Sequence, residues 1–171
     1  MQIGNVGGIG GMDLSSMDIE TAMMAVQQRR TQLLDGALSS QIKDVQGRND
    51  SISKLNTALG DITALQGKLE TKDGNTKLPD NDETKRLVAA AQASLTKAGL
   101  NPADFDLKTK GGLDTAVTKI KGAIDTQSNS QQMDMLRLQS LSNKRNEAFD
   151  VMTNFVKKMQ DNRSSIIGNM R

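Results

Sequence analysis

The chain contains no cysteine and no histidine, and its only aromatic residues are three phenylalanines among 171 residues. It therefore has no thiol nucleophile, no disulfide, no imidazole base and none of the usual zinc ligand sets. A globular core of this size usually draws much of its buried area from aromatic side chains. The composition favours thin layers of Leu, Ile, Val and Met between helices, as in coiled coils, over one large core.

The sequence also lacks a long apolar run and a strong charge of one sign. Its uninterrupted apolar stretches, such as Ala22–Val26, are far short of the roughly 20 residues that a membrane-spanning helix needs. The 22 basic and 20 acidic residues leave a net charge of +2. We expect no direct membrane span, and no nucleic-acid partner, because a phosphate-binding surface needs a clear excess of basic residues.

Residues 1–17 are rich in Gly and Ser, and they have neither the basic nor the apolar region of a cleavable secretory signal. Their glycine pattern lacks the preceding strand and the following Lys of a phosphate-binding loop. Such a segment buries too little apolar surface to offset the entropy lost on ordering. We expect this segment to be flexible, and export of the protein, if it occurs, to proceed without a cleaved signal peptide.

Residues 18–70 are predicted to form one long helix that begins after Asp18, its expected N-cap. Residues at alternating steps of three and four form a seam that continues for about seven heptads and includes some polar members. Four glycines interrupt this helix, and each costs about 1 kcal/mol relative to Ala. The helix therefore needs a packing partner, and its predicted kink or break is at Gly47–Ser51.

Residues 71–112 are predicted to be a small insertion with turns and one short helix. Asp80 or Asp82 is the expected N-cap of a helix over 83–97, which Gly99 ends. Phe105 is expected to pack the insertion against the long helices. The acidic run that opens the short helix lacks the Gly and the closing Glu of a calcium loop, so no metal site is predicted.

Residues 113–171 are predicted to form a second long helix, with a local weakness at Ser128–Gln132. Its expected seam passes through Gln131, Met135, Leu138, Ser142, Arg145, Phe149, Met152, Val156, Met159, Arg163, Ile166 and Met170, and Leu141, Ala148 and Phe155 widen it on one flank. The polar stretch Ser142–Asn146 interrupts the apolar pattern. Two explanations remain open: it fixes the register of the helix pair, or it faces another subunit or a wet channel.

The whole pattern predicts an all-α fold in which two long helices form an antiparallel coiled coil with a small inserted subdomain, as one structural domain overall. Apolar residues at the end of a thin helical hairpin, such as Ile166 and Ile167, favour burial against another copy of the chain. The residues expected to make coiled-coil and self-assembly contacts are Leu38, Val45, Ile52, Leu55, Leu59, Ile62, Met135, Leu138, Leu141, Arg145, Phe149, Met152, Phe155, Val156, Ile166, Ile167 and Met170.

No set of residues predicts catalysis, and neither a catalytic residue nor a cofactor is expected. Ser39-Ser40 and Ser164-Ser165 have no His or positioned Lys beside them in the sequence. The basic pairs, such as Arg29-Arg30, fit a solvated helix face better than a binding site for an acidic partner. An enzyme or a delivered effector is therefore the weakest of the functional classes.

Two segments carry a resemblance to a known family. The stretch NSQQMDMLRLQSLSNKRNEAFDVMTNF with the later SSIIGNMR, and the stretch MDIETAMMAVQQRRTQLLDGALSSQIKDVQ, resemble the C-terminal and first helices of type III secretion needle-tip and tip-filament proteins. The EspA-like filament subunits and the related Bordetella tip protein are the nearer comparison. The shared features are Asn129-Ser130-Gln131, the ladder of Met133, Leu136, Leu138 and Leu141, Arg145, and Ile166–Gly168.

The resemblance implies a secreted structural subunit at the bacterial cell surface, exported by the type III route through its flexible first residues. It implies self-association as a needle cap or a hollow filament, with the needle subunit, translocator proteins and an export chaperone as partners. The alternative is a cytosolic coiled-coil export chaperone or gatekeeper of the same secretion system. Such a protein would co-purify with a secreted partner and stay out of the culture supernatant.

Overall fold

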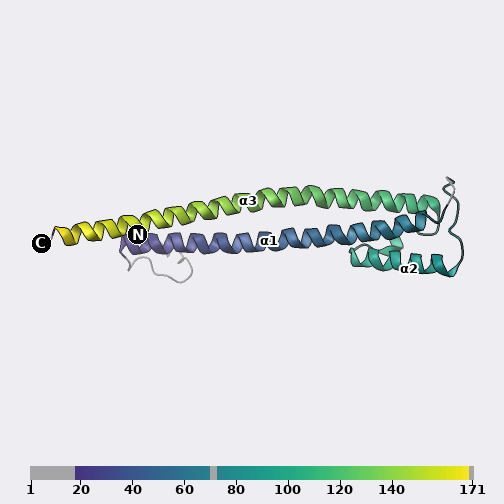
Figure 1. Ribbon diagram of the computed structural model, residues 1–171, viewed down its shortest axis with the longest axis horizontal. Helices are drawn as coiled ribbons and strands as arrows, with labels where there is room; N and C mark the ends of the chain where they lie inside the picture. The colour runs from purple at the N-terminus through teal and green to yellow at the C-terminus, as the bar shows by residue number, and fades with distance from the viewer. Residues whose placement is uncertain (1–17, 70–72, 170–171) are drawn as a thin grey trace, which may run out of the picture. The chain divides into compact units, whose positions relative to one another are not determined.

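The computed structural model describes residues 18–69 and 73–169 (Figure 1). Helix α1 spans Ile19–Gln66, α2 spans Asp82–Lys97, the 3-10 helix η3 spans Pro102–Asp104, and α3 spans Lys110–Gly168. The long helices α1 and α3 run antiparallel and pack against each other, which confirms the predicted all-α fold with two long helices. The segment 1–17, which was expected to be flexible, lies outside the described residues.

The chain divides into two compact units. The core unit comprises residues 41–137, which include α2 and η3 together with the adjoining stretches of α1 and α3. The terminal unit comprises residues 18–40 and 138–169 among those described. Each unit thus contains one stretch of α1 packed against one stretch of α3.

The hydrophobic core of the core unit lies where α1, α2 and α3 meet. Its buried side chains come from α1 (Leu55, Ala58, Ile62 and Leu65), from α2 (Ala91 and Leu95), from the loop before α3 (Leu107) and from α3 (Leu113, Ala116 and Ile120). Phe105 packs against this cluster, as predicted. Full burial of one such large aliphatic side chain stabilises the fold by roughly 1.5–3 kcal/mol, so this cluster anchors the insertion to the long helices.

Helix α2 has well-formed caps at both ends. Asn81, and neither Asp80 nor Asp82, is its N-cap: the Asn81 side chain accepts a hydrogen bond from the Thr84 backbone N–H at 2.8 Å. The prediction was wrong by one residue because Asn is as good a cap as Asp. At the other end Gly99 adopts a φ of 77°, and the Leu100 N–H donates to the Leu95 carbonyl at 2.9 Å. This Schellman motif confirms the predicted end of the helix.

Helix α3 begins at Lys110, three residues before its expected start. An isolated antiparallel bridge joins Lys77 to Thr109 just ahead of it. The Thr109 hydroxyl donates to the Asp106 carboxylate at 2.6 Å and accepts from the Gly112 N–H at 3.1 Å, so it caps the first turn. Any Cβ at position 112 would lie 2.6 Å from the Asp106 side chain, so only Gly permits this close approach.

Neither long helix breaks at the segment where an interruption was expected. α1 runs unbroken through Gly47–Ser51, and α3 runs unbroken through Ser128–Gln132. Both predictions considered the local sequence alone, whereas each segment is held by polar contacts with the opposite helix that sequence propensity does not reveal. Those contacts are part of the candidate site below.

Candidate assembly surface

The inward face of α1 follows the predicted seam. Leu55 and Ile62 are buried, and Leu38, Val45, Ile52 and Leu59 are half-buried. The polar members of the seam also face inward: Thr31 and Gln41 are buried and Arg48 is half-buried. The alternation of three and four residues therefore identified the packed face of α1 even where its members are polar.

The inward face of α3 differs from its prediction at alternate positions. The buried and half-buried positions are Asp134, Leu138, Leu141, Arg145, Ala148, Met152, Phe155 and Met159. Met135 and Phe149, expected in the seam, are 50% and 43% exposed, whereas Ser142 and Val156 lie half-buried on its flank. At one position the prediction was one residue off, because the charged Asp134 was passed over for Met135. Phe149 was expected in the seam and Ala148 on its flank, whereas Ala148 is the buried residue of the two.

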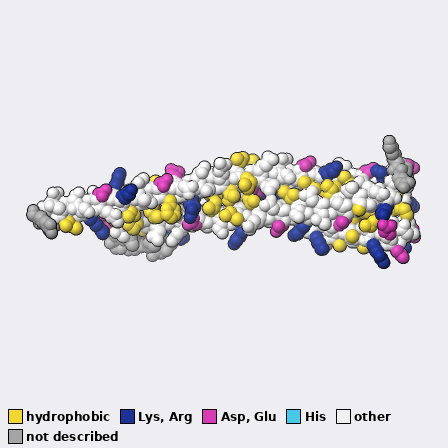
Figure 2. Space-filling view, viewed as in Figure 1, with side chains coloured by type: hydrophobic (Ala, Val, Ile, Leu, Met, Phe, Trp, Pro, Cys, Tyr) yellow, Lys and Arg dark blue, Asp and Glu magenta, His cyan; other side chains and the backbone are white. Residues whose placement is uncertain are grey.

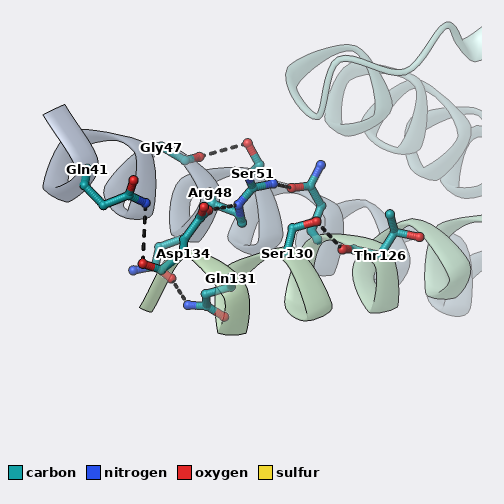
Figure 3. Close-up of polar contacts among 10 residues, drawn as sticks. Gln41, Gly47, Arg48, Ser51, Thr126, Ser130, Gln131 and Asp134 are labelled. Atoms are coloured by element: carbon teal, nitrogen blue, oxygen red, sulfur yellow. Dashed lines mark hydrogen bonds and ion pairs between the residues drawn. The ribbon is translucent and has the colours of Figure 1, made fainter. Parts of the chain in front are cut away.

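A polar layer crosses the helix pair of the core unit (Figure 3). The Arg48 guanidinium donates through Nε to Asp134 Oδ2 at 2.6 Å and through Nη1 to Gln127 Oε1 at 2.8 Å. The Gln41 amide donates to the Asp134 backbone carbonyl at 3.4 Å. The hydrogen bond from Arg48 lowers the pKa of Asp134 below its usual value, against the opposing effect of burial.

The neighbouring contacts explain why α1 and α3 continue through their polar segments. Gln131 donates to Asn49 across the helix pair. Within α1 the Ser51 hydroxyl donates to the Gly47 carbonyl at 2.9 Å, and within α3 the Ser130 hydroxyl donates to the Thr126 carbonyl at 3.0 Å. Polar residues that would favour turns in isolation are thus satisfied within the helices or across the pair.

A charged contact joins the two helices of the terminal unit at the centre of the polar stretch Ser142–Asn146. Arg145 donates through Nε to the Asp35 carboxylate of α1, and its guanidinium carbon lies 5.5 Å from the centroid of the Phe149 ring. Ser142 is half-buried, and the other three residues of the stretch are exposed. This contact favours register control as the role of Arg145, because Asp35 can pair with it in one alignment of the helices.

Apolar side chains are exposed over much of the terminal unit. Figure 2 shows hydrophobic side chains at the surface along both of its helical stretches. Among the described residues, eight of the twelve exposed large apolar side chains belong to this unit, namely Ile19, Met23, Val26, Leu33, Phe149, Val151, Ile166 and Ile167. Ile166 and Ile167 are 61% and 68% exposed, while Met170, also expected at the assembly contact, lies outside the described residues.

Buried apolar side chains are few in the same unit. Only Ala148 and Met159 reach full burial among its described apolar residues. Ile19, Met23 and Val26 line an apolar groove along the start of α1. A surface of this kind, on a unit with so small a core, is typical of a protein that buries it against another molecule.

A cavity of about 290 Å³ also lies at the start of α3, lined by residues that include Asp104, Phe105 and Lys119. No group of three or more His, Cys, Asp or Glu side chains within 18–69 and 73–169 could hold a metal ion. In the same part of the chain, no helix has the length and apolar character required to cross a membrane. The candidate site is the exposed apolar surface of the terminal unit.

Two groups of residues on this surface were missed from the sequence. The half-buried Gln127 and Asp134, and the exposed Asp35 that pairs with Arg145, were missed because they are polar, although the alternation of three and four continues through the first two. The exposed Ile19, Val26 and Leu33 were missed because only one seam was traced along α1. Their spacing of seven residues is a visible signal of a second face.

No model of a protein family, no curated protein and no solved structure matches this chain.

Proposed function

We propose that the protein is a structural subunit of a type III secretion apparatus that assembles with copies of itself at the needle tip. The assembly is a cap or a hollow filament, outside the bacterial cell, that connects the needle to the translocon. The chain acts by packing, without catalysis and without a cofactor.

The observation that carries the proposal is the exposed apolar surface of the terminal unit. Among the described residues of this unit, the exposed large apolar side chains outnumber the buried apolar ones, and Ile166 and Ile167 are among the most exposed. Burying such side chains against another copy releases roughly 25 cal/mol for each Å² removed from water. The antiparallel pairing of α1 and α3 suits this role, because helix pairs combine through side-by-side packing into larger bundles.

The identity of the apparatus rests on the sequence resemblance. The needle subunit, translocator proteins and an export chaperone are proposed as partners on that basis alone. Secretion without a cleaved signal, through residues 1–17, belongs to the same proposal. A cytosolic export chaperone or gatekeeper is the alternative that an experiment has to separate from it.

The test measures the assembly state of the purified full chain. Sedimentation velocity across a range of concentrations, with negative-stain electron microscopy, should show rings, caps or filaments that grow with concentration. Ile166→Asp and Phe149→Asp should each abolish the large species, because each places a charge on the exposed apolar surface. Met133→Asp is the matched control: residue 133 is 67% exposed but belongs to the core unit.

Two results would contradict the proposal. One is a monodisperse monomer at every concentration that also fails to bind purified needles. The other is stable co-purification with a secreted protein together with absence from the culture supernatant, which would establish the chaperone alternative.

A further inference from the structure

Helix α1 carries a second heptad stripe on its outward face in the terminal unit. Apart from Arg30, its members are apolar: Ile19, Met23, Val26, Leu33 and Ala37, and all six residues are exposed. They follow one another at steps of four, three, four, three and four residues, the alternation that also marks the seam against α3. A stripe with this period fits the side chains of another α-helix. We call it the outer stripe.

The end of α3 is a helix segment without a helical partner among the described residues of this unit. Asp35 of α1 lies opposite Arg145 of α3 in an antiparallel pair, so Ile19, the first residue of α1, lies opposite Asp161. α3 continues beyond that point to Gly168, and Figure 1 shows its end reaching past the start of α1. Residues 161–168 are all exposed. We call them the α3 end.

The α3 end continues the packed seam of its own helix. The inward positions Met152, Phe155 and Met159 alternate at steps of three and four, and the same alternation reaches Ile166 after Asn162. Ile166 thus falls on the inward line of α3, but beyond the level at which α1 begins, so no residue of α1 covers it. A helix supplied by another molecule would complete the pair there, which makes the contact continuous with the interface between α1 and α3.

Charge and spacing match between these two surfaces. Arg29 and Arg30 are exposed at the middle of the outer stripe, and neither makes an ion pair within the described residues. On the α3 end, the exposed Asp161 precedes Ile166 by five residues. When the two helices lie antiparallel with Ile166 over Met23, Asp161 comes within one residue of Arg29, which allows an ion pair at the edge of the apolar contact. Arg163, also exposed on the α3 end, interacts with Asp18 of its own chain.

We propose that the outer stripe of α1 binds the α3 end of a second copy of the chain. This proposal rests on the proposed self-assembly and specifies its contact. The two surfaces differ, so the contact is head-to-tail, and each copy keeps one free stripe and one free α3 end. Copies can therefore be added without limit unless the chain of contacts closes into a ring.

The test uses two full-length variants, each altered on one of the two surfaces. The stripe variant carries Val26→Gln and Leu33→Gln, and the end variant carries Ile166→Gln and Ile167→Gln. Gln is a good helix former, so circular dichroism should show unchanged helicity. The control, Met133→Gln with Leu136→Gln, alters two exposed apolar residues outside both surfaces.

Each surface variant alone should sediment as a monomer at concentrations where the wild type assembles, an affinity loss of at least about 100-fold. The control should assemble as the wild type does. An equimolar mixture of the two variants should give a species of two chains and nothing larger, because one intact stripe then meets one intact α3 end. Reversing two charges with Arg29→Glu and Arg30→Glu should weaken assembly. Adding Asp161→Arg to that variant should restore assembly, because the charges are then opposite again.

Several outcomes would overturn the proposal. If the end variant alone forms dimers, the stripe pairs with itself. If the mixture stays monomeric, the two surfaces do not meet. A photo-cross-linker at position 26 that captures residues 1–17 of its own chain, and not residues 161–168 of another, would show that a different segment occupies the stripe.

The assay also separates this proposal from the one on which it rests. If the wild type remains a monomer, the proposed self-assembly fails and the contact fails with it. If the wild type assembles and both surface variants assemble equally well, only the contact is wrong.

Discussion

The core unit and the terminal unit are built from stretches of the same two helices, and they differ in how much apolar surface each buries. In the core unit α2 adds a third helix, and ten apolar residues from four segments form a buried cluster. In the terminal unit two helices pack alone, and they leave Ile19, Leu33, Ile166 and Ile167 largely exposed. A helix pair buries one stripe of each helix, so the faces that remain are available for other contacts.

The core unit also satisfies its buried polar groups more fully than the terminal unit does. The polar layer of the core unit satisfies Arg48, Asp134 and Gln127 together. In the terminal unit Gln27 is half-buried, and its Oε1 atom is buried without a hydrogen-bond partner among the described residues. An unsatisfied buried acceptor costs free energy. The core unit is therefore expected to hold the hairpin together, and the terminal unit to gain stability from contact with another molecule.

The largest predicted effect is a core truncation. Ile62→Ala removes a fully buried side chain from the core unit and should lower the free energy of unfolding by about 2–5 kcal/mol. Leu33→Ala, at an exposed position of the terminal unit, should change it by less than about 0.5 kcal/mol in the monomer. Urea unfolding followed by circular dichroism measures both. Equal losses would mean that the two units do not differ in packing as described.

A second comparison uses glycines. Gly112→Ala in the core unit should destabilise the fold by roughly 1–3 kcal/mol, because the new Cβ overlaps Asp106. Gly36→Ala in the terminal unit meets open space and should stabilise α1 by up to about 1 kcal/mol. Thermal unfolding of the two variants should therefore shift in opposite directions. A stabilised Gly112→Ala would contradict the close approach at the start of α3.

The third prediction concerns acid. Arg48 lowers the pKa of Asp134 below 3.8, so the carboxylate stabilises the fold at neutral pH, and this contribution is lost as the pH falls through the lowered pKa. Asp134→Asn should reduce stability at pH 7 and make the remaining stability fall less steeply below about pH 4. Arg48→Gln should have the same effect because it removes the donor.

Hydrogen exchange can place this acid effect within the molecule. On acidification the loss of amide protection should be larger at residues 41–52 and 124–137, around the polar layer, in the wild type than in Asp134→Asn. Asp18 and Asp106 also have lowered pKa values and should contribute equally in both proteins. A wild type and an Asp134→Asn variant with the same pH profile would exclude a stabilising role for the layer.

The helical period predicted much of this fold. Alternating steps of three and four along α1 identified its inward face from Leu38 to Ile62, and Asp18 was correctly expected as its N-cap, since its Oδ1 accepts from the Thr21 N–H at 2.8 Å. The class of fold and the position of the insertion follow from the same period. These features depend on residues close together in the chain, so they can be predicted from a single sequence.

The features that sequence did not predict depend on partners distant in the chain. Gly47–Ser51 was expected to break the helix, yet Arg48 is held there by Gln127 and Asp134. Met135 was expected on the inward face in place of Asp134, because a charged residue is acceptable there only when a partner such as Arg48 stands opposite. The outer stripe was overlooked because one amphipathic face was sought on a helix that carries two.

The ion pair between Asp35 and Arg145 also sets a length. It fixes which residue of α3 lies opposite the first residue of α1, and hence how much of α3 extends beyond it. A slip of one heptad would shorten or lengthen that extension by about 10 Å, and would leave both charges without their partner. One contact between two side chains thus sets how far the α3 end reaches beyond the start of α1.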